Sequence, residues 1–286
     1  MVKIGGVPEH FNLPILMAIE KGEFKQHGLE LAWTYYPGGT GAMTAALAEG
    51  ELDLAILLTE GFVSAVNQGL SARIVKVYID SPLVWGIYSG TSSITQSMYD
   101  HTPKKYAISR FGSGSHLMAM IHAEERGEKL TERDFTVINS LEAAIASLVK
   151  GETQAFYWEK MMTKKYVESG EVKLIGEFSA PWSGFLIVAT EKALAEKKDE
   201  IHRSLELINL ASADFKNDLY APLELQKRFQ MSNADISQWM GSTIWNTNFS
   251  IRRKGLENAI AALSRIHEKQ MDADISKLCD GGLDIK

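Results

Sequence analysis

The chain has 286 residues, of which 45% are hydrophobic and 23% charged, and its formal net charge is −6. This composition is typical of a globular protein, and the negative charge with scattered lysines and arginines argues against a nucleic-acid surface. The one cysteine, Cys279, excludes an internal disulfide and a cysteine-based metal cluster. We expect no metal and no cofactor.

No stretch reaches the roughly 18 apolar residues that a membrane span requires. The segment after Met1, VKIGGV, has no basic region and no cleavage site of a secretory signal. We therefore expect a cytoplasmic protein for the chain as written, or a periplasmic one if a leader was removed.

The first 80 residues alternate between the periodicities of strands and helices, which predicts a mainly parallel sheet with helices on both faces. Glycines stand where the expected helices stop. The expected elements are a strand at Lys3–Val7, a helix from Pro14 to Gly22, a strand at Leu29–Tyr36, a helix at Thr40–Glu49, a strand at Leu52–Leu58, a helix ending at Gly69 and a strand at Arg73–Asp80.

A second α/β segment begins at Leu83–Tyr88 and continues with Tyr106–Arg126. The pattern of Tyr106–Arg126 predicts a strand, a glycine and serine loop at Arg110–Gly114, and a helix starting near Ser115. Free N–H groups and the positive end of such a helix favour a bound ligand. The alternative is an ordinary strand-to-helix turn with Ser115 as the N-cap.

The segment Gly39–Gly69 resembles Ser140–Gly170, which indicates an internal duplication. We therefore predict an α/β fold of two lobes with a ligand cleft between them. Lobe one comprises residues 1–83 and 186–286, lobe two comprises 84–185, and the crossings lie near 81–90 and 179–189. Phe185–Ala189 is interpreted as the strand that returns to lobe one, and the helices after Glu191 are expected to cover that lobe.

The N-terminal segment carries a helix ending in KGEF, an HGL before the second strand, a glycine–threonine loop, and GELDLA before the third strand. In order and spacing it resembles the substrate-binding proteins of nitrate, sulfonate and taurine ABC transporters, and equally the NMT1/THI5-like proteins of thiamine-pyrimidine synthesis. The resemblance implies a type II periplasmic-binding-protein fold, hinge closure on a small ligand and, for a transporter protein, a permease partner. We expect a monomer.

The resemblance also implies that the ligand contacts loops after the strands of both lobes. The candidate ligand-binding residues are His10, Phe11, Asn12, Gly39, Thr40, Thr59, Glu60, Ser81, Leu83, Arg110, Gly112, Ser113, Gly114, Ser115, His116, Trp158, Glu159 and Trp182.

The pyrimidine synthases of this fold use a lysine and a histidine near the end of strand three and a cysteine-rich run at the second crossing. The corresponding segments here, Leu57–Glu60 and Ala180–Phe185, contain none of these residues. We therefore predict no catalytic residue and no enzymatic activity. The alternative is an enzyme of thiamine-pyrimidine metabolism that uses Glu60, Glu159 or His116 as an acid or base.

The charged candidates favour a ligand with N–H donors. Glu60 and Glu159 follow strand ends at similar places in the two repeats, and carboxylates pair well with such donors. Each acid could instead complement a helix N-terminus. Trp158 and Trp182 fit either a stacked ring or the core.

Arg110 and the helix start beside it suit an anion. We therefore predict a non-catalytic solute-binding protein for an amine-bearing or heteroaromatic ligand, with a thiamine-precursor pyrimidine as one candidate. A sulfonate-, taurine- or nitrate-type transport protein and an intracellular sensory domain stay open as alternatives. The sequence does not name the ligand.

Overall fold

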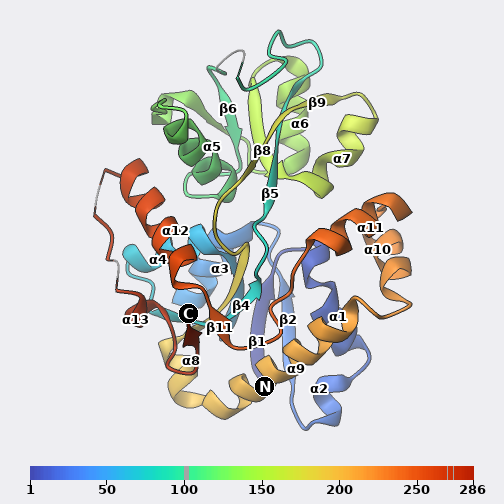
Figure 1. Ribbon diagram of the computed structural model, residues 1–286, viewed down its shortest axis with the longest axis vertical. Coiled ribbons are helices and arrows are strands. Elements are labelled where there is room, and N and C mark those ends of the chain that lie inside the picture. The colour runs from blue at the N-terminus through green and yellow to red at the C-terminus, as the bar shows by residue number, and fades with distance from the viewer. Residues whose placement is uncertain (100–102, 269, 273) are drawn as a thin grey trace. The chain divides into compact units, whose positions relative to one another are not determined.

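The computed structural model describes residues 1–99, 103–268, 270–272 and 274–286, and Figure 1 shows the arrangement of its elements. Their contacts form two units. The first unit comprises Met1–Ser81, Trp182–Ala259 and Asp272–Lys286, and the second comprises Pro82–Pro181 and Ile260–Met271. Residues 186–286, all expected in lobe one, are thus divided, because residues 260–271 group with the second unit.

The first unit contains a five-stranded sheet of order β2-β1-β3-β10-β4. Strands β1 and β2 pair in parallel, as do β1 and β3, whereas β10 runs antiparallel to both β3 and β4. The sheet is thus mixed, with four strands in one direction and β10 in the other. The bounds are β1 (Val2–Gly6), β2 (Leu31–Tyr35), β3 (Leu54–Leu58), β4 (Ala72–Ile79) and β10 (Phe185–Thr190).

The sheet of the second unit repeats this order as β7-β6-β8-β5-β9. Here β5 is the antiparallel strand, lying between β8 and β9. Strand β5 follows β4 in the chain but joins the second sheet, and β10 follows β9 but joins the first. The two sheets thus have the same strand order, and Phe185–Ala189 lies in β10 of the first sheet. The bounds are β5 (Val84–Gly90), β6 (Tyr106–Ile108), β7 (Phe135–Val137), β8 (Ala155–Glu159) and β9 (Val172–Ser179).

The helices of the first unit cover both faces of its sheet. The chain moves from β1 to β2 in one direction and from β2 through β3 to β4 in the other, so right-handed crossovers place the connecting helices on opposite faces. Figure 1 accordingly shows α1 on the other side of the sheet from α3 and α4. The bounds of the first four helices are α1 (Leu13–Glu20), α2 (Glu23–Gln26), α3 (Gly39–Ala48) and α4 (Thr59–Asn67).

Helices α8 to α11 and α13 belong to the first unit, and α9 packs against α1 and α2. Helix α12 begins in the first unit and continues into the second from Ile260. The bounds are α8 (Glu191–Glu196), α9 (Lys198–Phe215), α10 (Ala221–Phe229), α11 (Asn233–Ser242), α12 (Arg253–Ile266) and α13 (Ile275–Leu278), with a short parallel pair β11 (Ser250–Ile251) and β12 (Asp284–Ile285).

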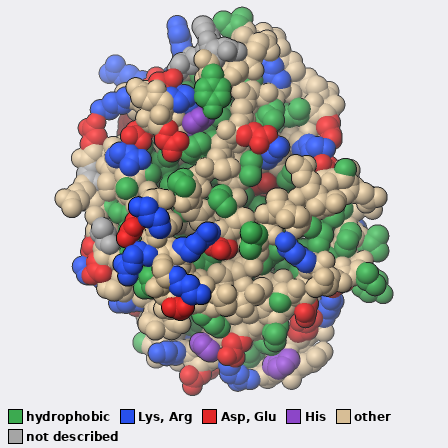
Figure 2. Space-filling view, in the orientation of Figure 1, with side chains coloured by type: hydrophobic (Ala, Val, Ile, Leu, Met, Phe, Trp, Pro, Cys, Tyr) green, Lys and Arg blue, Asp and Glu red, His purple; other side chains and the backbone are tan. Residues whose placement is uncertain are grey.

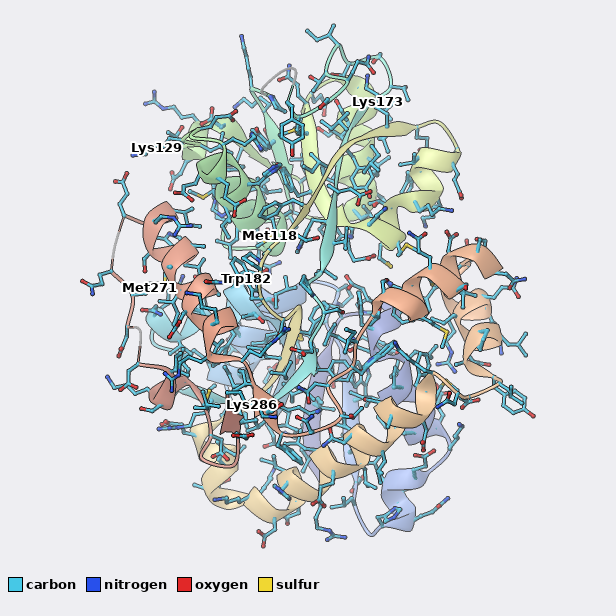
Figure 3. The ribbon with its side chains drawn as sticks, in the orientation of Figure 1. Met118, Lys129, Lys173, Trp182, Met271 and Lys286 are labelled. Carbon is cyan, nitrogen blue, oxygen red and sulfur yellow. The ribbon has the colours of Figure 1, made fainter. Side chains whose placement is uncertain are left out.

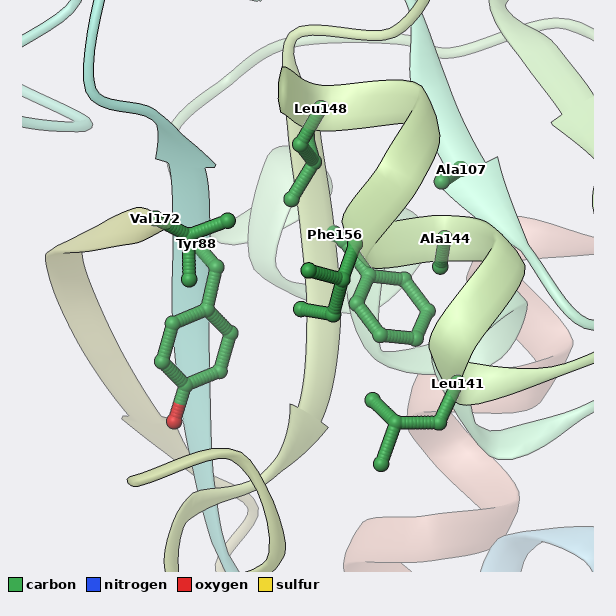
Figure 4. Packing of buried hydrophobic residues seen from close by; sticks show 8 residues of the cluster. Tyr88, Ala107, Leu141, Ala144, Leu148, Phe156 and Val172 are labelled. Atoms are coloured by element: carbon green, nitrogen blue, oxygen red, sulfur yellow. The ribbon is translucent and has the colours of Figure 1, made fainter. Parts of the chain in front are cut away.

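In the second unit, α5 (Gly114–Glu125), α6 (Leu141–Lys150) and α7 (Lys160–Glu168) flank the sheet. Helix α6 has apolar residues at helical spacing, and Leu141, Ala144 and Leu148 pack against Phe156 and Tyr88 of the sheet (Figure 4). The approach is close, because a Cβ on Gly90 would lie 2.2 Å from the carbonyl oxygen of Leu148. This contact requires glycine at position 90.

No helix among the described residues is long and apolar enough to cross a bilayer. On the face drawn in Figure 2, lysine and arginine side chains are interspersed with acidic ones. This pattern agrees with the scattered positive charge of the sequence.

Candidate functional site

The loop after β1 is mostly part of the core of the first unit. The imidazole of His10 packs against Phe11 and Trp239, with ring centroids 4.6 and 4.5 Å apart. Burial lowers the pKa of His10 to about 3, so the ring is neutral at physiological pH. The carbonyl oxygen of Phe11 accepts hydrogen bonds from the hydroxyl of Tyr78 and the indole of Trp245. Two residues expected at the ligand therefore serve packing.

Asn12 differs from these neighbours. Its Nδ2 donates to the carbonyl oxygen of Val7 at 2.7 Å, which orients the amide. Its Oδ1 is buried and has no hydrogen-bond partner among the described residues. Asn12 therefore offers a buried acceptor at the carboxyl end of β1.

The starts of α3 and α4 touch each other beside β3. Thr40 Oγ1 accepts from the backbone N–H of Leu58 at 3.4 Å, and a Cβ on Gly61 would lie 2.5 Å from the Thr40 methyl carbon. Gly39 has a positive φ of 65°, which suits the tight entry into α3. These residues fix the position of Thr59 and of the residue that follows it.

Glu60 lies in the first turn of α4 and is only 2% exposed. Its Oε2 accepts from the indole Nε1 of Trp182 at 2.9 Å, whereas its Oε1 has no partner among the described residues. Burial raises the pKa of this carboxyl to about 7, against the lowering effect of its own backbone N–H and of Trp182. Glu60 is thus a buried carboxyl near half-ionisation at neutral pH with one oxygen unused.

Trp182 is 5% exposed and is labelled in Figure 3, just before β10. Its indole contributes a hydrogen bond to Glu60, so it acts here as a partner of the acid. Ser81 and Leu83, between β4 and β5, also make structural contacts. Ser81 Oγ accepts from the N–H of Ile244 at 3.0 Å, and Leu83 is buried.

In the second unit, the loop before α5 is stabilised by its own side chains. The N-cap is Ser113, not Ser115, and its Oγ accepts from the N–H of His116 at 3.4 Å. The hydroxyls of Ser113 and Ser115 lie 2.9 Å apart, and Ser115 Oγ also accepts from the N–H of Ser109. The helix accordingly begins at Gly114, one residue earlier than expected.

His116 completes this loop. The N–H of Gly112, whose φ is 76°, donates to Nδ1 of His116 at 3.1 Å. The neutral imidazole therefore carries its proton on Nε2. Burial, and to a lesser extent the nearby His267, lower the pKa of His116 to about 4. Burial also lowers the pKa of the half-buried Arg110 from its ordinary value.

Glu159 and Trp158 lie at the end of β8. Glu159 is the N-cap of α7, and its Oε2 accepts from the N–H of Met162 at 2.8 Å. Burial raises the pKa of Glu159 to about 7. The indole of Trp158 stacks on Phe156 at 5.2 Å, and its Nε1 is buried without a partner among the described residues.

The two acids are therefore not equivalent. Leu58 is the N-cap of α4, whereas Glu159 itself is the N-cap of α7, so Glu60 stands two residues further into its helix. A carboxylate at the N-cap binds backbone N–H groups, which is the structural alternative weighed for both acids. That alternative fits Glu159, whereas the side chain of Glu60 accepts a hydrogen bond from the indole of Trp182.

Sequence reasoning missed Asp80 and Lys76, both on or beside β4. Asp80 accepts from Ser183 and Arg252. Lys76 is fully buried, and its Nζ donates to the carbonyl oxygens of Asn246 and Asn248 at 2.6 and 3.1 Å. Burial lowers the pKa of Lys76 to about 7. The signal available in the sequence was that Lys76 has apolar neighbours on both sides within a strand.

Within the described part of the chain, no three His, Cys, Asp or Glu residues come together as metal ligands. The site residues thus form hydrogen-bonding and stacking surfaces.

Two α/β units with the same strand order and exchanged strands β5 and β10 define the class: this chain has the fold of periplasmic binding proteins.

Comparison with known proteins agrees with this class. Residues 1–99 match the model of the NMT1-like family, and residues 85–178 match the model of the Ca3427-like periplasmic binding proteins. The family resemblance and fold class predicted from the sequence are therefore confirmed. None of the curated proteins matches the sequence.

Three solved structures illustrate the likeness. The CA3427 gene product of Candida albicans, described as defining a family with the generic periplasmic binding protein fold, is 23% identical with a TM-score of 0.90, over 99% of this chain and 97% of its own. The aliphatic sulphonate binding protein SsuA of Escherichia coli is 16% identical with a TM-score of 0.72, over 100% and 93% of the chains. The alkanesulfonate-binding SsuA of Xanthomonas axonopodis pv. citri, bound to MOPS, is 14% identical with a TM-score of 0.78, over 100% and 98%. At these identities the likeness concerns the fold.

Proposed function

We propose that this chain is a solute-binding protein without catalytic activity, and that its ligand is an amine-bearing or heteroaromatic small molecule. A thiamine-precursor pyrimidine is one candidate. The observation that carries the proposal is the unpartnered Oε1 of Glu60, a carboxyl that is 2% exposed at the start of α4. The expectation that two lobes clamp the ligand stays a prediction.

An oxygen of this kind favours a ligand that donates N–H groups. A buried acceptor without a partner costs about 1–3 kcal/mol, and a ligand donor at that oxygen recovers this free energy. The unpartnered Oδ1 of Asn12 supports the same chemistry, because β1 and β3 are neighbours in the sheet. An amine or an aminopyrimidine supplies such donors, whereas a sulfonate group supplies none.

The second candidate is a ligand of the sulfonate or taurine type that is recognised through its sulfonate group, supported by Arg110 and by the names of the two SsuA structures. The hydrogen bonds in the loop before α5 argue against a strong anion-binding site there. The N–H groups of Gly112, Ser113 and His116 already donate to acceptors within the loop.

Titration calorimetry with three ligands tests the proposal. The ligands are 4-amino-5-hydroxymethyl-2-methylpyrimidine, taurine and ethanesulfonate, of which the last two differ by the amine alone. We expect an amine-bearing ligand to bind, and Glu60→Gln to weaken its binding about tenfold or more, because the variant replaces an ionisable acceptor by a neutral amide that cannot carry a charge. Glu191→Gln, which removes an exposed acid paired with Arg73, is the control and leaves affinity unchanged.

Ethanesulfonate binding as tightly as taurine, with affinity lost in Arg110→Gln and kept in Glu60→Gln, would establish the anion alternative.

The enzymatic alternative is tested separately. Incubation with pyrimidine phosphates followed by mass spectrometry is expected to give no new product.

The biological setting is part of the proposal. A transport role calls for an ABC-transporter permease as partner and a location outside the inner membrane, and the names of the SsuA structures support it. The native gene start and a permease gene beside it test this role. A chain without a leader and without a neighbouring permease gene would favour the intracellular sensory alternative. Sedimentation equilibrium tests the expected monomer.

A further inference from the structure

Residues Trp182–Gly184, where the chain re-enters the first unit, are tied to the junction between β3 and α4. The indole of Trp182 donates to Glu60. The hydroxyl of Thr59 donates to the carbonyl oxygen of Ser183 at 2.5 Å, and the N–H of Thr59 donates to that of Gly184 at 3.4 Å. The re-entry segment is thus held by the same two residues that begin α4.

The re-entry segment is also tied to the place where the chain leaves the first unit. Ser183 Oγ donates to Asp80 Oδ1 at 2.9 Å, and the N–H of Gly184 donates to the carbonyl oxygen of Ser81 at 3.1 Å. Arg252, just before α12, donates to Asp80 as well. The chain crosses between the two units after Ser81, before Trp182 and after Ala259. The segments of the first unit that lead to these three crossings are therefore hydrogen-bonded to one another.

The two oxygens of Glu60 have different roles in this arrangement. Oε2 holds the indole of Trp182, and Oε1 lies buried without a partner among the described residues. A donor that reaches Oε1 favours the ionised carboxylate over the protonated form. The bond at Oε2 is thereby strengthened, because a hydrogen bond to a carboxylate is roughly twice as strong as one to a neutral group.

We propose that Glu60 is a ligand-responsive latch, in which an N–H donor of the ligand at Oε1 strengthens the hydrogen bond from Trp182 to Oε2 and so fixes the re-entry segment to the first unit. The identity of the donor rests on the proposed function, whereas the link from Glu60 through Trp182 to the crossing does not. The ligand thereby acts on the backbone that joins the units, and Trp182 is a positioning residue.

The latch is supported by the state of the carboxyl. Burial raises its pKa to about 7, which brings the change between the protonated and ionised forms close to neutral pH. A cationic or strongly donating ligand group shifts this balance to the carboxylate. The remaining contacts of the segment, Thr59 with Ser183 and Ser183 with Asp80, carry the change to the end of β4.

Hydrogen exchange by ¹H–¹⁵N NMR tests the latch first without any ligand. The indole signal of Trp182, one of six tryptophans, is assigned by its loss in Trp182→Phe. We expect Glu60→Gln to speed exchange of this indole N–H about tenfold, and the N–H of Gly184 to exchange faster in both variants. The N–H of Ile187, in the buried middle of β10, is the internal control and stays unchanged.

The second arm adds 4-amino-5-hydroxymethyl-2-methylpyrimidine, with taurine as a second probe. A bound probe is expected to slow exchange of the Trp182 indole in the wild-type protein but not in Glu60→Gln. Glu191→Gln, at the other end of β10, behaves as the wild type.

The outcomes separate the two proposals. Unchanged exchange at Trp182 and Gly184 in ligand-free Glu60→Gln overturns the latch, and so does an equal acceleration at Ile187, which indicates general destabilisation. Probe binding without any change at Trp182 also overturns it. Failure of every probe to bind counts against the proposed function, while the ligand-free arm still decides the link between Glu60 and the crossing.

Discussion

Replacing Glu60 by Gln is expected to change how the stability of the protein depends on pH. In the folded chain, burial raises the pKa of Glu60 from 4.5 to about 7. The folded state therefore binds more protons than the unfolded state between these values, and the free energy of unfolding falls as pH rises through this window. The loss is nearly complete about one pH unit above the folded-state pKa.

The magnitude follows from the shift. Because one pKa unit corresponds to about 1.4 kcal/mol, the ionised carboxyl costs the fold about 3 kcal/mol at pH 8. Gln does not ionise, so the stability of Glu60→Gln relative to the wild type rises by about 2–3 kcal/mol between pH 5 and pH 8. Glu159, whose pKa is also raised to about 7, is present in both proteins and cancels in the difference.

Urea denaturation at pH 5, 6, 7 and 8 measures this difference, provided that the m-values of the two proteins agree. The control is Glu191→Gln. Ser71 and Arg73 lower the pKa of Glu191, so its effect is constant above pH 5. A constant difference between wild type and Glu60→Gln across the four pH values would refute the idea that burial of an unpaired carboxyl raises this pKa.

Three further changes test other parts of the structure. Lys76→Met is expected to lose stability relative to the wild type as pH rises from 7 to 10 in urea titrations, because a lysine whose folded-state pKa is lowered to about 7 stabilises the fold most at high pH; a pH-independent difference would contradict this. Gly61→Ala is expected to cost about 1–3 kcal/mol, since the new methyl group meets Thr40, and an unchanged melting temperature would show that α3 and α4 can separate freely. Ser113→Ala removes the N-cap of α5 and is expected to cost about 1 kcal/mol by urea denaturation, whereas no loss would mean that the hydroxyl is dispensable to the loop.

The bond between the hydroxyls of Ser113 and Ser115 also affects how the site can be probed. Alanine at both positions tests ligand binding by this loop only if the fold stays intact. Both hydroxyls accept backbone N–H groups, Ser113 from His116 in the first turn of α5 and Ser115 from Ser109 just after β6. A loss of affinity in that double variant would therefore mix binding with stability, and Glu60→Gln is the sharper test.

The alternation of strand and helix periodicities determined most of the architecture. It predicted the two repeats and the return strand Phe185–Ala189, because buried parallel strands are continuous apolar runs and helices end at glycine. Only the tertiary structure decided which unit α12 joins from Ile260 on, since its apolar stripe is the same whichever core it meets.

Long-range contacts also decided which candidate residues pack in the core and which keep a polar atom for a ligand. His10 lies in the core because Trp239, more than 200 residues later, packs on its ring. Glu60 and Glu159 look alike in the sequence, yet a two-residue difference in where the helices begin makes Glu159 an N-cap and turns Glu60 to Trp182. Sequence pattern places an acid near a strand end, and the packing of distant segments decides which of its oxygens remains for a ligand.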